Sequence, residues 1–307
     1  MEIYQLRSFV TVAHQGNLSR AAEKLFLSQP AVSAHIKALE EELGVDLFER
    51  SSKGMRLTAM GETLVVNAEK TLAAAREMLT QARQLTGELS GTIRLGTMSD
   101  PFSLRLGEVL GRFSSDYPKV GFQIRGGIGG DVLDAVRADD LDVGYVLGKA
   151  EPDGVLVFHQ LAEIRLCIAA PAAWKEKIAN ADWPQLAALP WLATPPRCAF
   201  HGIVNDLLKD YPGATMHLVE ADQEATLKGL VASGAGLALL REDKALVSEA
   251  AGEICLWKKN TYCTDLLFVC RKERSQDPAL QALLGLVQQV WKAAEPASAV
   301  RTSLQLS

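Results

Sequence analysis

The stretch "FLSQPAVSAHIKALEEELG", residues 26–44, decides how the front of this chain folds. Ser28 is a good N-cap, and Pro30 suits the first turn of a helix, where its missing N–H costs nothing. Gly44 is a good residue to end the helix. The apolar residues between them are spaced by four, three and four, as one face of a helix requires: Val32, Ile36, Leu39 and Leu43.

Two shorter helices precede this one and a hairpin follows it. The first helix keeps a helical apolar period and ends at Gly16-Asn17, and the second has four apolar residues: Ala21, Ala22, Leu25 and Phe26. After Gly44, "LFER" and "MRLT" bracket "SSKG", a pattern typical of two strands joined by a tight loop. Residues 1–58 therefore predict a helix-turn-helix with a wing.

The outward face of the third helix is shaped to enter a groove. Its front half carries the small or polar residues Gln29, Pro30, Ser33 and Ala34. Lys37 follows them on the same face. Small residues let a helix backbone sink into a DNA major groove about 12 Å wide, with Gln29 and Ser33 near the base edges. The glutamates at 40–42 would repel phosphate, so we expect that end to point away.

The wing supplies the cations that a DNA backbone needs. Arg50, Lys53 and Arg56 lie close together in sequence and suit phosphate or minor-groove contacts. A charged loop is often only solvated, and a generic helical bundle is the other alternative. The combination of this wing with the upstream helices favours DNA binding.

Composition restricts how such binding works. The chain has 307 residues, 48% of them hydrophobic, and a net charge of −5, so it suits about two packed domains and no uniformly basic coat. Residues 1–58 hold seven Lys and Arg against seven Asp and Glu. Contacts with phosphate therefore depend on where the cations are placed.

The chain shows no leader-like N-terminus and no run of about 18 apolar residues, so we expect a cytoplasmic protein without membrane contact. Its five cysteines are odd in number and not closely paired, which favours reduced thiols over disulfides or structural zinc. We expect no cofactor.

Residues 59–89 predict a long linker helix. Apolar residues recur every three or four positions, as in a coiled-coil seam: Leu64, Ala68, Leu72, Ala75, Leu79, Ala82 and Leu85. We expect this stripe to pair with a second copy of the chain; docking onto the same chain is the alternative.

Residues 90–307 alternate short β-rich runs with helical ones, which predicts parallel sheets covered by helices. We expect two α/β lobes with a cleft between them, lobe I at about 91–161 and 268–295 and lobe II at about 162–267. The last residues, "PASAVRTSLQLS", have no apolar period.

Residues 18–61, "LSRAAEKLFLSQPAVSAHIKALEEELGVDLFERSSKGMRLTAMG", closely resemble the winged helix-turn-helix of LysR-type transcriptional regulators. The resemblance implies a dimerising linker helix, a periplasmic-binding-protein-like effector domain, homodimers that commonly form homotetramers, and binding to double-stranded promoter DNA. It also implies base-reading or groove-lining roles for Gln29, Pro30 and Ser33, and backbone contacts for Arg50 and Lys53. Many relatives have Arg where this chain has Ala34, so the bases read here are expected to differ.

The resemblance places a small-molecule effector near "GTMSDPFSLRLG", residues 96–107, with Thr97, Ser99 and Asp100 as candidates. Asp100 before a proline is also a good helix N-cap, which would occupy the same donors. "GGIGGD", residues 126–131, lacks the sixth-position glycine of a dinucleotide fingerprint. A turn that admits a ligand or a neighbouring backbone is the better interpretation, with Gly129 at the cleft rim.

"TPPRCAFHG", residues 194–202, gathers the most unusual side chains of lobe II. Arg197 suits a ligand carboxylate, His201 a further hydrogen bond, and Phe200 an aromatic group. Cys198 is either a small buried side chain or a redox sensor activated by Arg197 and His201; a metal site on Cys198 and His201 has little support.

No catalytic motif of hydrolases, P-loop enzymes or metalloproteases is present, so we do not expect an enzyme, although a two-lobed metabolic enzyme remains a distant alternative. The sequence thus predicts a regulator whose effector is a small organic acid, an amino-acid-like molecule or an aromatic metabolite. A redox-switched regulator that uses Cys198 is the alternative function.

Overall fold

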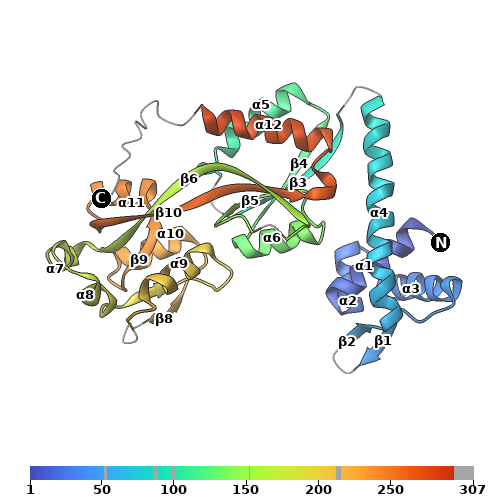
Figure 1. Ribbon diagram of the computed structural model, residues 1–307, viewed down its shortest axis with the longest axis horizontal. Helices are drawn as coiled ribbons and strands as arrows, with labels where there is room; N and C mark the ends of the chain where they lie inside the picture. Colours follow the sequence, from blue (N-terminus) through green and yellow to red (C-terminus); the bar gives the residue numbers. More distant parts are fainter. Residues whose placement is uncertain (52–53, 86–88, 99–100, 152, 212–215, 294–307) are drawn as a thin grey trace, which may run out of the picture. The chain divides into compact units, whose positions relative to one another are not determined.

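The computed structural model describes residues 1–51, 54–85, 89–98, 101–151, 153–211 and 216–293. The chain divides into two compact units, Met1–Glu88 and Leu89–Ser307. Each is described by itself (Figure 1). Lys53, Ser99, Asp100 and the C-terminal tail lie outside the described residues.

The first unit is a winged helix-turn-helix. Its helices are α1 (Ile3–Gln15), α2 (Leu18–Leu25) and α3 (Gln29–Leu43), followed by the antiparallel hairpin of β1 (Phe48–Ser51) and β2 (Gly54–Leu57) and by α4 (Ala59–Leu85). Asn17 caps α2 by accepting from Ser19 N and Arg20 N at 2.9 and 3.1 Å. Ser28 caps α3, and Gly44 ends it in the left-handed region at φ 69°.

The core of this unit confirms most of the predicted helical faces. Val32, Ile36 and Leu39 of α3 are buried together with Phe9 and Leu47. Two predictions are wrong: Phe26 ends α2 in the left-handed region and is 95% exposed, and Leu43 is 38% exposed. Leu43 is the last residue of α3, and the chain turns away at Gly44, so no neighbouring element covers it.

The first half of the linker helix packs within its own unit. Ala68 and Leu72 of α4 are buried in the winged-helix core, and Leu64 packs against that core. His14 of α1 contacts Glu69 of α4 at 2.9 Å. The expectation that the whole seam is reserved for a second copy is therefore wrong for this half, because α1 already covers it.

The second unit is built around a six-stranded mixed sheet of order β4-β3-β5-β10-β6-β9. Lobe I contains β3 (Gly91–Thr97), α5 (Leu106–Asp116), β4 (Val120–Gly126), α6 (Gly129–Arg137), β5 (Val143–Leu147) and, at the end of the chain, α12 (Pro278–Lys292). Strands β3, β4 and β5 are parallel, as the alternation of strands and helices predicted.

Two long strands, β6 (Leu156–Pro171) and β10 (Ile254–Arg271), run antiparallel through both lobes (Figure 1). The prediction of purely parallel sheets is wrong here, because β10 also pairs antiparallel with β5 and β6 pairs antiparallel with β9. The apolar pattern of a buried strand is the same in either direction, so the sequence did not reveal the antiparallel pairs.

Lobe II carries most of the short elements. They are η1 (Ala172–Trp174), α7 (Lys175–Ala179), α8 (Trp183–Ala187), β7 (Trp191–Ala193), α9 (Ala199–Leu208), β8 (Met216–Glu220), α10 (Glu224–Ala232), β9 (Ala238–Arg241) and α11 (Glu242–Ala250). A short turn, η2 (Lys272–Arg274), joins β10 to α12. Strand β7 is parallel to β8, and its Trp191 also forms a parallel bridge with Leu237, directly before β9, so the carboxyl ends of β7 and β9 lie on the same side.

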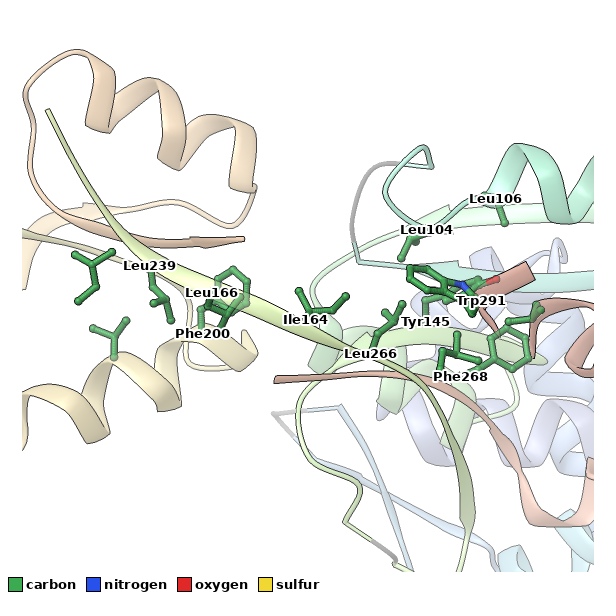
Figure 2. Packing of buried hydrophobic residues seen from close by; sticks show 14 of the residues in the cluster. Leu104, Leu106, Tyr145, Ile164, Leu166, Phe200, Leu239, Leu266, Phe268 and Trp291 are labelled. Atoms are coloured by element: carbon green, nitrogen blue, oxygen red, sulfur yellow. The ribbon is translucent and has the colours of Figure 1, made fainter. Parts of the chain in front are cut away.

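One apolar core extends along β6 into both lobes. Figure 2 shows Leu239, Leu166 and Phe200 together at one end and Tyr145, Phe268 and Trp291 at the other, with Ile164 between them. Tyr145 and Phe268 pack edge to face with ring centroids 5.0 Å apart. The two lobes are thus joined by packed side chains as well as by backbone.

Helix α5 begins later than the sequence indicated. Residues 101–105 form turns, and Arg105 adopts a left-handed conformation with φ 52° before the helix starts at Leu106. This bend places both Leu104 and Leu106 in the core. Asp100 itself lies outside the described residues, so its expected role as a helix cap stays a prediction.

Candidate DNA-binding and effector sites

The outward face of α3 presents the expected groove-facing residues. Gln29, Pro30, Ala34 and Lys37 are exposed, and Ser33 is half-buried. Gln29 Oε1 accepts from the Ser19 hydroxyl at 3.1 Å, which connects the start of α3 to α2. The front of α3 is therefore small, polar and held in place by its neighbour.

The three glutamates at the other end of α3 each have a structural role that the sequence did not indicate. Glu40 Oε1 accepts from Leu47 N at 2.8 Å and Phe48 N at 3.3 Å, which fastens α3 to the first strand of the wing. Glu41 lies 3.6 Å from Lys37, and Glu42 contacts the N-terminal ammonium group. Glu40 thus joins α3 to the wing, whereas Glu41 and Glu42 form exposed ion pairs.

The wing holds two of its three candidate cations in described strands. In the register of the hairpin Arg50 is opposite Met55, and Arg56 is opposite Glu49. Arg56 is exposed. Glu49 and Arg56 therefore share one face of the hairpin, where opposite charges on paired strands attract each other.

In the second unit, Arg197 joins the two lobes. Its Nε donates to Asp131 Oδ1 at 2.6 Å, and its Nη2 donates to Gly130 O at 2.7 Å and to Asp134 Oδ2. The hydrogen bonds from Asp134 and Asp131 raise the pKa of Arg197. The guanidinium group proposed for a ligand carboxylate is thus engaged by two carboxylates of α6.

Gly130 allows this close approach. A Cβ at this position would lie 2.9 Å from Arg197 Cβ and 3.0 Å from Arg197 O, and Gly130 N donates to that same carbonyl at 3.1 Å. The glycine-rich turn therefore admits a neighbouring backbone, one of the two predicted uses. At Gly129 no described atom lies within 4 Å of an added Cβ, so that position remains open.

Cys198 lies just before α9 and is partly buried. Burial raises the pKa of its thiol, although the backbone N–H groups of Phe200 and His201 and the Thr194 hydroxyl act in the opposite direction. The other four cysteines are also free thiols. A raised pKa keeps the thiol protonated, which is unfavourable for a redox sensor.

Two neighbours of Cys198 are engaged by the protein. Phe200 is 6% exposed and packs in the core beside Leu166 and Leu239 (Figure 2). Its ring is not available for stacking on a ligand, so that expectation is wrong. His201 Nδ1 lies 2.6 Å from Thr194 O. A carbonyl only accepts, so Nδ1 carries the proton and Nε2 remains for another contact.

Thr97 is the described member of the first predicted effector segment. It ends β3, is 6% exposed, and its carbonyl accepts from Gly127 N at 2.9 Å. Asp131 and Asp134 of α6 were not predicted as site residues. Their only signal in the sequence was an acidic pair three positions apart after a glycine-rich turn, which is common on solvated helices.

None of the described helices has the length and apolar composition needed to cross a membrane. Within the described ranges, no three His, Cys, Asp or Glu side chains come together as a metal site.

Known proteins resemble both units. The family described as "Bacterial regulatory helix-turn-helix protein, lysR family" matches residues 3–62, and the "LysR substrate binding domain" matches residues 86–292. The transcriptional regulator GltR of Bacillus subtilis is 27% identical over 297 residues, which cover 92% of this chain and 95% of GltR.

Solved structures share the fold. A variant of full-length OxyR from Pseudomonas aeruginosa has a TM-score of 0.66 at 24% identity, with 95% of each chain covered. Full-length CbnR in complex with its target DNA has a TM-score of 0.55 at 23% identity, with 94% of this chain and 99% of CbnR covered. With both family domains matched in order along one chain, the protein belongs to the LysR family of bacterial transcriptional regulators.

Proposed function

We propose that this protein binds promoter DNA through α3 and the wing, and that a small molecule held between the lobes of its second unit changes that binding. The observation that carries the DNA-binding half is the exposed front of α3. Gln29, Pro30 and Ala34 are small or uncharged, so the helix backbone approaches base edges closely, and Lys37 follows one turn later.

Base selection and phosphate attraction are assigned to different residues. Gln29 and Ser33 read bases, Pro30 lines the groove, and Lys37, Arg50, Lys53 and Arg56 contact the backbone. Because Ala34 has no hydrogen-bonding side chain, it gives no direct readout at a position where many relatives have Arg. We therefore expect the preferred DNA site to differ from theirs.

The oligomer and the domain limits are part of the same proposal. Two copies pair through α4, and pairs of dimers form tetramers; residues 1–58, 59–89 and 90–307 act as DNA-binding, linker and effector segments. Since the proposed target is chromosomal DNA, the protein works in the cytoplasm. The effector acts by binding one arrangement of the oligomer more tightly than another.

The test is a footprint of the full-length protein on the DNA upstream of its own gene, followed by fluorescence anisotropy at several salt concentrations. Lys53→Ala should weaken binding to all sequences and lower the slope of log K against log salt by about one. Ser33→Ala should change which sequence is preferred. Lys292→Ala, an exposed lysine of the second unit, is the matched control.

Absence of any footprint would refute the DNA-binding assignment. An unchanged salt slope for Lys53→Ala, with binding lost for one sequence only, would show that Lys53 reads bases instead of phosphate.

A further inference from the structure

Arg241 is a buried cation, and one of its N–H donors lacks an acceptor among the described residues. It is the last residue of β9, and its side chain is 4% exposed. Its Nε and Nη2 donate to Asp243 at 3.1 and 2.9 Å. Its Nη1 is buried and has no hydrogen-bond partner among the described residues. Burying a charged donor without an acceptor costs free energy. We therefore expect an oxygen atom from outside the described protein to accept a hydrogen bond from Arg241 Nη1.

Two further polar groups of lobe II lie near the end of β9. Glu224, the first residue of α10, accepts from Arg241 N at 2.8 Å through Oε1, and burial raises the pKa of its carboxyl group while Arg241 acts to lower it. Glu224 in turn acts electrostatically on Cys198. The Thr194 hydroxyl lies beside that thiol and acts to lower its pKa, and the buried Thr194 Oγ1 has no other hydrogen-bond partner in the described structure.

These groups lie on the side of lobe II that meets lobe I. Thr194 directly follows β7, Arg241 ends β9, and Glu224 and Cys198 lie at the amino ends of α10 and α9. From the next turn, Lys244 Nζ lies 5.8 Å from the ring centroid of Phe102 in lobe I. Ligands of open α/β sheets bind outside the carboxyl ends of the strands, which is where this group is found.

The charges of the group balance. Arg241 and Lys244 are positive, Glu224 and Asp243 are negative, and the neighbouring Glu242 is paired with Arg165 at 3.2 Å. A simple anion would add an uncompensated charge beside Glu224, whereas a molecule with both a carboxylate and an ammonium group adds none. We propose that the effector is an α-amino acid, whose carboxylate accepts from Arg241 Nη1 and the Thr194 hydroxyl and whose ammonium group faces Glu224. This inference rests on the proposed effector-responsive function.

Arg197 is the rival carboxylate partner, and its geometry is less suitable. Three acceptors on α6 already engage its Nε and Nη2. Arg197 is also 47% exposed, so a ligand carboxylate there would compete with Asp131, Asp134 and water. The buried Arg241 Nη1, which has no acceptor among the described residues, therefore favours a ligand carboxylate more strongly than Arg197 does.

The test screens the full-length protein against the twenty proteinogenic L-amino acids by thermal shift and then titrates each one that shifts the melting temperature by calorimetry. The N-acetyl and amide derivatives of the best amino acid remove its ammonium and carboxylate charges one at a time. We expect at least one amino acid to bind saturably and both derivatives to lose about tenfold or more in affinity.

Variants then identify the protein groups. Arg241→Gln should abolish the advantage of the free carboxylate, and Glu224→Gln should abolish that of the free ammonium group. If Arg241→Gln fails to fold, the isosteric Thr194→Val variant takes its place and should weaken the carboxylate preference. Arg165→Gln, on a 62% exposed arginine of the same lobe, is the control and should bind as the parent does.

Two results would overturn the inference: no amino acid binds, or the carboxylate preference survives in Arg241→Gln and is lost in Arg197→Gln. DNA anisotropy on the same samples separates the two claims. Retained DNA binding without amino-acid binding refutes only the effector class, whereas a protein that binds no DNA refutes the proposed function itself.

Discussion

At the scale of single residues, Cys198 shows how surroundings decide chemistry. Arg197 is adjacent in sequence and suggested an activated thiolate, but its guanidinium group is turned toward Asp131 and Asp134 of α6. Burial dominates at the thiol and raises its pKa. The guanidinium group of Arg197, which would lower the pKa of the Cys198 thiol, is thus paired with two carboxylates of α6.

We therefore expect DNA binding to be insensitive to peroxide. Both the parent protein and Cys198→Ser should keep their affinity after treatment with a modest excess of hydrogen peroxide, because a protonated thiol reacts slowly. Anisotropy before and after treatment measures this. A loss of binding in the parent that is absent in Cys198→Ser would establish the redox alternative.

At the scale of elements, the junction between the wing and α4 depends on Gly61. A Cβ on Gly61 would lie 2.1 Å from Leu47 O and 3.0 Å from Leu57 Cδ2. The same carbonyl accepts from Thr58 N at 3.1 Å, and the Thr58 hydroxyl accepts from Gly61 N at 2.9 Å. The wing and the linker helix thus meet backbone to backbone.

Gly61→Ala should destabilise the first unit by about 1–3 kcal/mol, because a backbone carbonyl must move to admit the methyl group. Thermal unfolding followed by circular dichroism, together with DNA affinity, measures the effect. Gly107→Ala in α5 is the matched control, since an added Cβ meets no described atom within 4 Å there. Equal melting temperatures and DNA affinities for Gly61→Ala and Gly107→Ala would contradict the close backbone packing inferred at Gly61.

A second element-scale feature ties α12 to the sheet. Asp142 precedes β5, is 3% exposed, and accepts from Arg94 N and Arg94 Nη2 at 2.6 Å each; it also pairs with Arg274. Arg274 Nη2 reaches Asp277 at 2.7 Å, and Asp277 caps α12. Burial alone would raise the pKa of Asp142, but the two arginines outweigh it and the pKa is lowered.

Asp142→Asn should therefore cost about 1–3 kcal/mol of stability near pH 7, since it removes the buried carboxylate that both arginines share, although Asp139 and Asp277 remain as their partners. With a folded pKa below the unfolded value of about 3.9, the carboxylate stabilises the fold above that value and loses its effect as the pH falls through the folded pKa. Tryptophan fluorescence reports this unit alone, because all five tryptophans lie beyond residue 88. If the difference in unfolding free energy between the parent and Asp142→Asn does not shrink in acid, the ion-pair explanation is wrong.

At the scale of the whole molecule, an exposed apolar side chain of α4 indicates where two chains would pair. Ala68 and Leu72 of α4 are buried within the unit, whereas Met78, further along the same helix, is 67% exposed. Met78 directly precedes Leu79 of the predicted seam, and an exposed apolar side chain at the edge of that seam fits a second copy packing there.

Met78→Glu should weaken the dimer at least tenfold by placing a charge in the proposed helix pair. Met78→Leu, which keeps the apolar volume, should leave it intact. Sedimentation over a range of protein concentrations measures both. A dimer that tolerates Met78→Glu would place the contact on another face of the chain.

The sequence by itself determined the local elements and the family. Helix caps, apolar periods and the spacing of residues 18–61 depend only on neighbours along the chain, so the winged helix-turn-helix was predictable almost to the residue. Only the tertiary structure decided that β6 and β10 pair antiparallel, that Phe200 is core and that Arg197 bridges the lobes. It also revealed the buried Arg241 Nη1, because whether a donor finds an acceptor depends on which distant side chains surround it, and no local pattern specifies them.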